Sequence, residues 1–313
     1  MEFRHYDWKK QNYIASAYGI THNGFYLDGD NHVRFSRIQP EYKAYLEQLN
    51  MWYQEGYITS DFLTATKQDA QKVFQSGNAG MTVGGNWETM TLNAVGKVAN
   101  PEFDVIGVPY PRLKEDDILN YAKPLESIND KAYFISATCE HPVEAIRFMD
   151  YWYSEGARLL TAWGPGNEEY PTFDIVDGKR KVSTFMTDNP EYDYSIARDR
   201  FTLNNFQAMF DNEMEKQQYE PYPEKMETWE NWAYNTTSDF RVPEMITPTV
   251  DENRELSSIM TAIDTYTDEM ILKFIVGNEP LDNFNTFAET VKTMEIDRAI
   301  EIQQAAVDRY FAR

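Results

Sequence analysis

The sequence predicts an α/β fold that is rich in helices and organised as two domains. Three observations lead to this prediction. Helical apolar spacing alternates along the chain with short strand-like runs. The 313 residues are 42% hydrophobic, which is enough to bury a large core. A chain of this length also fits two domains more comfortably than one.

The first predicted element is a hairpin. In GFYLDGDNHVRFS, Asp28 and Gly29 separate two alternating apolar runs, 25–27 and 33–35. The acidic residues of this turn suggest a calcium site as an alternative, but the loop lacks the glycine and the distal glutamate of a calcium-binding hand. We therefore predict ordinary turn chemistry here.

An amphipathic helix is predicted next. Pro40 suits its first turn and Gly56 suits its end. Apolar residues recur at helical spacing and predict one buried face. They are Tyr42, Tyr45, Leu46, Leu49, Trp52 and Tyr53.

The stretch QDAQKVFQSGNAGMTVGGNW, residues 68–87, carries the most information. Helical apolar spacing runs into Ser-Gly-Asn turn chemistry, and 81–83 then fits a short buried strand. Gly84 and Gly85 permit backbone angles closed to other residues, so we expect the chain to swing and to project Asn86 and Trp87 from the strand end. The alternative is that Trp87 is an ordinary core residue.

The elements that follow continue the alternation. Strands are predicted over 104–109 and 131–136, with a polar loop between them. A helix opened by Pro142 is predicted to bury Ala145, Ile146, Phe148, Met149 and Trp152. A short helix ending near Trp163 and a small hairpin over 176–183 come after it.

The pattern F-x-x-G-x-A-G-M-x-x-x-G-x-W resembles a signature of extracellular solute-binding proteins of ABC importers, family 1, of the carbohydrate-binding type. It is formed by Phe74, Gly77, Ala79, Gly80, Met81, Gly85 and Trp87. The resemblance continues through roughly 12–312. It implies a periplasmic-binding-protein-like two-lobe fold, type II-like. It also implies that Trp87 stacks on a sugar ring between the lobes, with Asn86 and Glu88 as nearby hydroxyl partners.

A second loop, AWGPGNEEYPTF, resembles the glycine-glutamate loop at the cleft of that family, although its order departs from the usual G-x-E-G. The resemblance implies that Trp163, Glu168 and Tyr170 form the opposing wall of the site. The alternative is an aromatic plug over the core. A third aromatic cluster, TWENWAY at 228–234, has two tryptophans on one helix face and is predicted to pack.

The resemblance also divides the chain. It implies a lobe with the signature over 1–120, a return segment of the other lobe over 121–205, and a carboxyl-terminal helical segment over 206–313 that packs on the lobes. Members of the family begin with a lipoprotein signal and a first lobe segment that this chain lacks, so we expect an incomplete amino-terminal lobe. The implied location is extracellular, as a membrane-anchored lipoprotein in the full-length form.

Charge restricts the ligand. The formal net charge is −22, from 29 basic and 51 acidic residues, which argues against nucleic acid as a partner because phosphate neutralisation needs a basic face. An anionic polymer is disfavoured for the same reason. Cys139 is the single cysteine, so an intrachain disulfide is excluded.

Catalytic motifs are missing from the sequence. It contains no H-E-x-x-H, no G-x-S-x-G and no phosphate-binding loop, and its four histidines are scattered. We predict no catalytic residue, no metal and no cofactor. The predicted function is to capture an oligosaccharide by hinge closure between two lobes and to deliver it, as a monomer, to the permease subunits of an ABC transporter. The alternatives are a carbohydrate-active enzyme and a non-transport module that senses glycans or mediates surface interactions.

Overall fold

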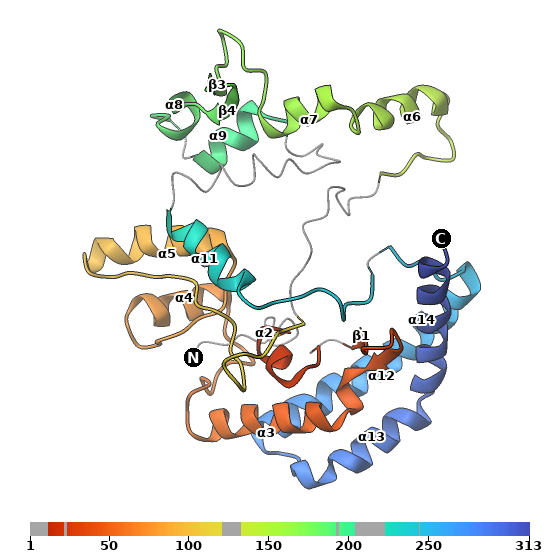
Figure 1. Cartoon of the computed structure of the whole chain (residues 1–313). Coiled ribbons are helices and arrows are strands. Elements are labelled where there is room, and N and C mark those ends of the chain that lie inside the picture. Colours follow the sequence, from red (N-terminus) through yellow and green to blue (C-terminus); the bar gives the residue numbers. More distant parts are fainter. Residues whose placement is uncertain (1–11, 22–23, 121–132, 192–193, 204–222, 244) are drawn as a thin grey trace. The chain divides into compact units, whose positions relative to one another are not determined.

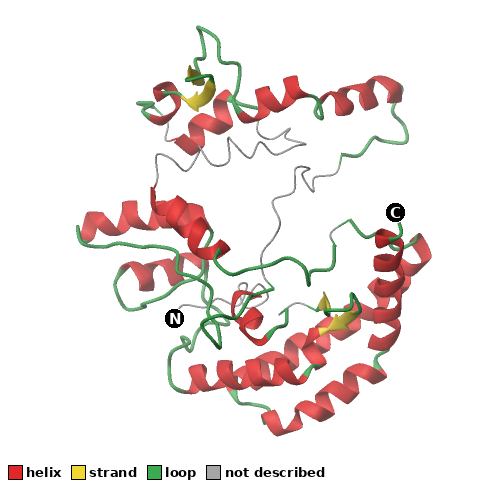
Figure 2. Ribbon diagram, viewed as in Figure 1, coloured by secondary structure: helices red, strands yellow, loops and turns green. Residues whose placement is uncertain are grey.

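A computed structural model describes residues 12–21, 24–120, 133–191, 194–203, 223–243 and 245–313 (Figures 1 and 2). The chain forms two compact units. Unit 1 combines Met1–Lys123 with Thr228–Arg313, and unit 2 is Pro124–Glu227. The helices after residue 227 belong to unit 1.

Unit 1 consists mainly of helices, with one hairpin. Its elements before residue 123 are α2 (Asn12–Ala15), the 3-10 turns η1 (Ser16–Tyr18) and η2 (Ser36–Ile38), β1 (Phe25–Leu27), β2 (Val33–Phe35), α3 (Pro40–Gln54), α4 (Lys67–Gln75) and α5 (Asn86–Ala99). Helix α11 (Pro223–Ala233) spans the second boundary. After it come α12 (Val250–Val276), η4 (Leu281–Asn283), α13 (Phe284–Thr293) and α14 (Ile296–Phe311).

The predicted hairpin is confirmed. Strands β1 and β2 are antiparallel, with Phe25 opposite Phe35 and Leu27 opposite Val33. The Asp28 carboxylate accepts hydrogen bonds from the backbone N–H groups two and four residues later, which is the turn chemistry expected of aspartate. Helix α14 supplies a side chain to the edge of β2, because Gln304 Oε1 accepts the Val33 N–H at 2.7 Å.

The core of unit 1 lies among α3, α12, α13 and α14, which lie side by side in Figure 1. The predicted face of α3 is confirmed for its four central residues, which are fully buried: Tyr42, Tyr45, Leu46 and Leu49. Arg37 is also buried, and its guanidinium donates to Thr267 and Asp268 on α12 at 2.5 and 3.0 Å. Burial of this charge is offset by these bonds.

Helix α12 has clear signals at both ends. Thr249 and Glu252 form a reciprocal capping box at its start, and Gly277, with φ +82°, ends it in the left-handed conformation. Seven of its residues are buried, at helical spacing: Leu256, Ile259, Ile263, Thr267, Ile271, Phe274 and Ile275. No helix among the described residues combines the length and the apolar character that a membrane crossing requires.

Two strands predicted in unit 1 are wrong. The run 81–83 contains a single bridge residue, Thr82, and 104–109 is extended but is not part of a sheet. The backbone of Val105 pairs with the side chain of Asn93 on α5, and that of Gly107 pairs with Thr228 and Asn231 on α11. Side chains of two helices thus take the bonds that a neighbouring strand would make.

Unit 2 contains shorter elements. They are α6 (Pro142–Tyr151), α7 (Glu155–Ala162), β3 (Phe173–Val176), β4 (Lys179–Val182), α8 (Thr184–Thr187) and α9 (Tyr194–Phe201). The predicted hairpin over 176–183 is confirmed, with Asp177 and Gly178 at positive φ in its turn. The strand predicted over 131–136 starts outside the described residues, and its described part, 133–136, is not a strand.

The buried face predicted for α6 is largely wrong. Only Trp152, which caps the helix, is buried, whereas Ile146 and Phe148 are 57% and 52% exposed. The spacing of these residues produces an apolar face, but burial requires another element to cover it. Among the described residues, small apolar clusters form elsewhere in unit 2, around Trp163 and Met186.

Candidate functional site

The predicted binding residues of unit 1 lie at the start of helix α5. Asn86 and Trp87 are its first two residues, and Gly85 is the N-cap. The expectation that they project from a strand end is therefore wrong. The two glycines lead into a helix because Glu88, at the third helical position, can satisfy a backbone N–H that the helix start leaves unpaired.

Glu88 is held by protein groups. It is only 7% exposed, and its Oε2 accepts the Gly85 N–H at 2.8 Å. Its Oε1 accepts from Gln71 Nε2 at 3.0 Å and forms an ion pair with Lys67 Nζ at 2.5 Å. Lys67 and Gln71 are not among the residues predicted from the sequence. The one available signal was their separation by four residues, which puts both on one face of a helix.

The predicted binding residues of unit 2 follow helix α7. Trp163 caps that helix and is 2% exposed, with its ring at 5.9 Å from that of Phe173. This position agrees with the alternative, an aromatic plug. Glu168 is exposed, and Tyr170 is 38% exposed with its ring 5.8 Å from Phe201. A ligand contact remains a prediction for all three predicted residues.

The loop that carries these residues is held by its own polar groups. Tyr170 N–H donates to Asn167 Oδ1 at 2.7 Å, and Gly166 N–H donates to Thr172 Oγ1 at 3.1 Å. A hydrogen bond from the Tyr170 hydroxyl to Glu169 raises the pKa of the phenol, so this hydroxyl stays protonated at neutral pH. The Glu168 carboxylate and the oxygen of the Tyr170 hydroxyl, whose O–H already donates to Glu169, both offer acceptors for the hydroxyl groups of a ligand.

Two stretches that connect the units contact each other inside unit 1. Tyr110 stacks on Trp232 at 6.1 Å, and the backbone of Leu119 pairs with Asn235 and Thr237. Arg112 lies over the ring of Tyr234 at 4.9 Å and donates to its carbonyl oxygen. The third aromatic cluster of the sequence therefore packs, as predicted, against the stretch that leaves unit 1.

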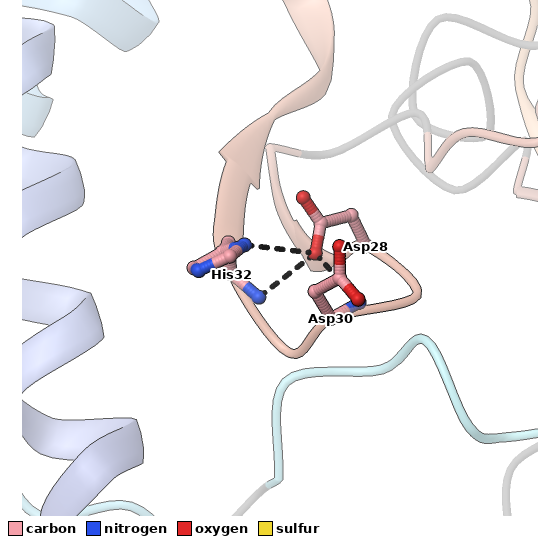
Figure 3. Close-up of side chains that lie close together, drawn as sticks. All are labelled: Asp28, Asp30 and His32. Atoms are coloured by element: carbon pink, nitrogen blue, oxygen red, sulfur yellow. Dashed lines mark hydrogen bonds and ion pairs between the residues drawn. The ribbon is translucent and has the colours of Figure 1, made fainter.

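The hairpin turn groups three possible metal ligands, Asp28, Asp30 and His32 (Figure 3). Asp28 Oδ1 already accepts two backbone N–H groups, and its Oδ2 accepts from Arg34 Nε at 2.9 Å. These bonds lower the pKa of the Asp28 carboxyl even though desolvation opposes them. The arrangement is that of a hydrogen-bonded turn with a neighbouring cation, which a metal ion would have to displace.

A surface groove of about 540 Å³ lies elsewhere in unit 1, between β2 and α14. Its lining includes His32, Ile300 and Gln304. None of the predicted binding residues lines it. The groove and the candidate site at α5 are therefore separate features.

Comparison with known proteins identifies the family. The model of the family described as bacterial extracellular solute-binding protein matches residues 3–159, about half of the chain. No curated protein matches the chain.

Several solved structures are similar over nearly the whole chain. Alginate-binding protein AlgQ2 is 18% identical with a TM-score of 0.67, and covers 98% of this chain and 63% of its own. The S. pneumoniae ABC-transporter substrate-binding protein FusA, in complex with kestose, is 16% identical with a TM-score of 0.66. The match covers 96% of this chain and 60% of FusA. An HMO-binding solute-binding protein from Bifidobacterium longum infantis is 14% identical with a TM-score of 0.65. The match covers 99% of this chain and 64% of that protein.

These likenesses confirm the predicted fold class, a helix-rich, two-lobe, periplasmic-binding-protein-like α/β fold. The chain spans about three fifths of the length of the structures that it matches. The signature that ends at Trp87 falls inside the stretch matched by the family model. The chain belongs to the bacterial extracellular solute-binding protein family.

Proposed function

We propose that this chain is the carbohydrate-binding component of an ABC importer. It captures an oligosaccharide between two lobes and delivers it to the permease transmembrane subunits. The observation that carries the proposal is the signature ending at Trp87, within the family-matched stretch. The similar structures support the ligand class, since they include an alginate-binding protein, an HMO-binding protein and a complex with kestose.

Hinge closure is the proposed mechanism. A sugar that contacts both lobes gains contacts that only the closed form offers, so binding shifts the population toward closure. Trp87 provides a flat apolar ring for the sugar face, and Asn86 binds hydroxyl groups. Glu168 and Tyr170 form the second wall, and Trp163 supports it from behind, packed against Phe173. Glu88 assists at α5, either by direct contact or through the turn that it holds.

The proposed ligand is a neutral oligosaccharide. A net charge of −22 repels polyanions unless a local basic pocket compensates for it. The binding step involves no covalent chemistry, which is in keeping with a family of binding proteins. We further propose that the protein acts as a monomer outside the cell and that its full-length form is anchored through a lipid, as the resemblance implies.

A thermal-shift screen tests the ligand class. Neutral oligosaccharides, including fructo-oligosaccharides, are compared with alginate oligomers, on this chain and on any longer reading frame that contains it. A ligand at a hundred times its Kd stabilises the native state by about 2.7 kcal/mol, which raises the melting temperature. We expect a saturable shift with one neutral class. Release of shortened products would instead support the enzyme alternative.

Replacement of Trp87 tests the site. We expect Trp87→Ala to weaken binding by about 1 to 3 kcal/mol, because a stacking face is lost, while Trp87→Phe retains most of the affinity. Tyr57→Ala is the matched control, since Tyr57 is 57% exposed and lies outside the site. Calorimetric titration measures affinity and urea denaturation measures stability. A lower stability with unchanged affinity would place Trp87 in the core and refute the assignment.

A further inference from the structure

The buried Glu88 carboxylate connects two helices of unit 1. It receives Lys67 and Gln71 from helix α4 and the Gly85 N–H from its own helix start, at 2.5, 3.0 and 2.8 Å. A carboxylate that is 7% exposed needs such partners, because burial of an unpaired charge is costly. Two of these partners, Lys67 and Gln71, come from a separate helix, so the start of α5 is tied to α4 by more than chain connectivity.

Gly84 makes this close approach possible. A Cβ atom at residue 84 would lie 2.7 Å from Glu88 Oε2 and 3.2 Å from its carboxyl carbon. Any other residue at this position would push the carboxylate away from its partners. The glycine of the signature region is therefore matched to the glutamate four residues later.

We propose that Lys67, Gln71 and Glu88 form a clamp that positions the first turn of α5, the turn that carries Asn86 and Trp87, for sugar binding. This inference rests on the proposed function. The first turn of a helix has backbone N–H groups without helical partners and is prone to fray. A turn that is fixed before the sugar arrives saves the ordering cost at binding, so the clamp raises affinity without touching the ligand.

The clamp gives Glu88 a role different from direct hydroxyl binding. Lys67 and Gln71 distinguish the two roles, because they reach the carboxylate from α4 and can be changed while Glu88 stays intact. If Glu88 contacts the sugar, removal of Lys67 frees the carboxylate for that contact. If Glu88 positions the turn, removal of Lys67 loosens Trp87.

The test combines Lys67→Met, Gln71→Leu and Glu88→Gln with a Trp87→Ala background. We expect Lys67→Met and Gln71→Leu each to weaken binding of the sugar found in the screen by about fivefold or more, and this loss to disappear when Trp87 is already alanine. Lys72→Met, on an exposed position of the same helix, is the control and should leave affinity unchanged. If Lys67 and Gln71 only stabilise the fold, their replacement lowers stability, and the loss of affinity is the same whether residue 87 is tryptophan or alanine.

Hydrogen exchange of the peptide covering residues 84–92 gives a readout that needs no sugar. The clamp predicts faster exchange in Lys67→Met and Gln71→Leu than in the parent chain and the Lys72→Met control. Unchanged exchange overturns the clamp. If Glu88→Gln loses affinity while Lys67→Met and Gln71→Leu keep it, Glu88 contacts the sugar directly and the positioning role is refuted. If the parent chain binds no glycan, the proposed function fails, and the positioning of a sugar site fails with it, whereas faster exchange would still show that the clamp orders the turn.

Discussion

Two regions of unit 1 are stabilised in opposite ways. Helices α3, α12, α13 and α14 share a continuous apolar core, whereas the extended stretch 104–109 is held by polar side chains of α5 and α11. In the first region, many apolar contacts between buried side chains together stabilise the fold. In the second, a few hydrogen bonds each serve one backbone group. The comparison teaches that the cost of a substitution depends on how much buried apolar contact it removes in the first region, and on which single hydrogen-bonding side chain it removes in the second.

The largest effect is expected in the helical core. Phe274 is fully buried, with its ring at 5.6 Å from that of Phe287. Phe274→Ala should lower the free energy of unfolding by about 3 to 5 kcal/mol, through lost burial and a residual cavity. Urea denaturation followed by circular dichroism measures this. Phe311→Ala, at a 56% exposed position of α14, should change stability by less than about 0.5 kcal/mol. Equal effects of the two substitutions would contradict the described core.

A smaller but more local effect is expected at the extended stretch. Asn93 accepts the Val105 N–H at 2.8 Å and donates to the Val105 carbonyl at 3.0 Å. Asn93→Ala removes both bonds and should cost about 1 to 3 kcal/mol. The Val105 amide should also exchange faster with solvent, which hydrogen exchange by NMR measures. Asn253→Ala, on the exposed surface of α12, is the control. Unchanged exchange of the Val105 amide would contradict the conclusion that polar side chains hold the stretch 104–109.

The smallest effect concerns surface charges around the core. Hydrogen bonding to Arg298 lowers the pKa of the Glu255 carboxyl below its usual value. A lowered pKa in the folded state stabilises the fold above the unfolded value of about 4.3, and this stabilisation disappears as the pH falls through the folded value. Thermal melts of the parent chain and Arg298→Gln should therefore differ at neutral pH and converge in acid. A difference independent of pH would point to lost packing of the arginine stem instead.

Much of the fold was predictable where local chemistry suffices. Both hairpins contain an Asp-Gly pair, which lies between two apolar runs in the first hairpin, and helix α3 follows from Pro40 and its apolar spacing. The strands expected at 81–83 and 104–109 failed because a strand needs a partner, and no local pattern reports that Asn93 takes that place. The face of α6 failed similarly, since spacing cannot indicate whether another element covers it.

The candidate site was predictable in part. Resemblance selected Trp87, but the sequence pattern placed it at a strand end, and the helix start became visible only through the bonds of Glu88. Lys67 and Gln71 escaped prediction because their contact with Glu88 spans two helices and a turn. Motif reading finds side chains that a ligand would meet. It does not find the groups that hold them in place.

The contact between Gly107 and Thr228 bears on how such proteins can be recombined. A Cβ atom at residue 107 would lie 2.2 Å from Thr228 Cγ2, so the two positions must be chosen together. Unit 2, Pro124–Glu227, is inserted between them in sequence. A chimera that exchanges unit 2 with cuts just before Pro124 and just after Glu227 keeps the pair from one parent. A crossover between residues 107 and 228 would take these two residues from different parents. A side chain at residue 107 would then clash with a threonine at residue 228.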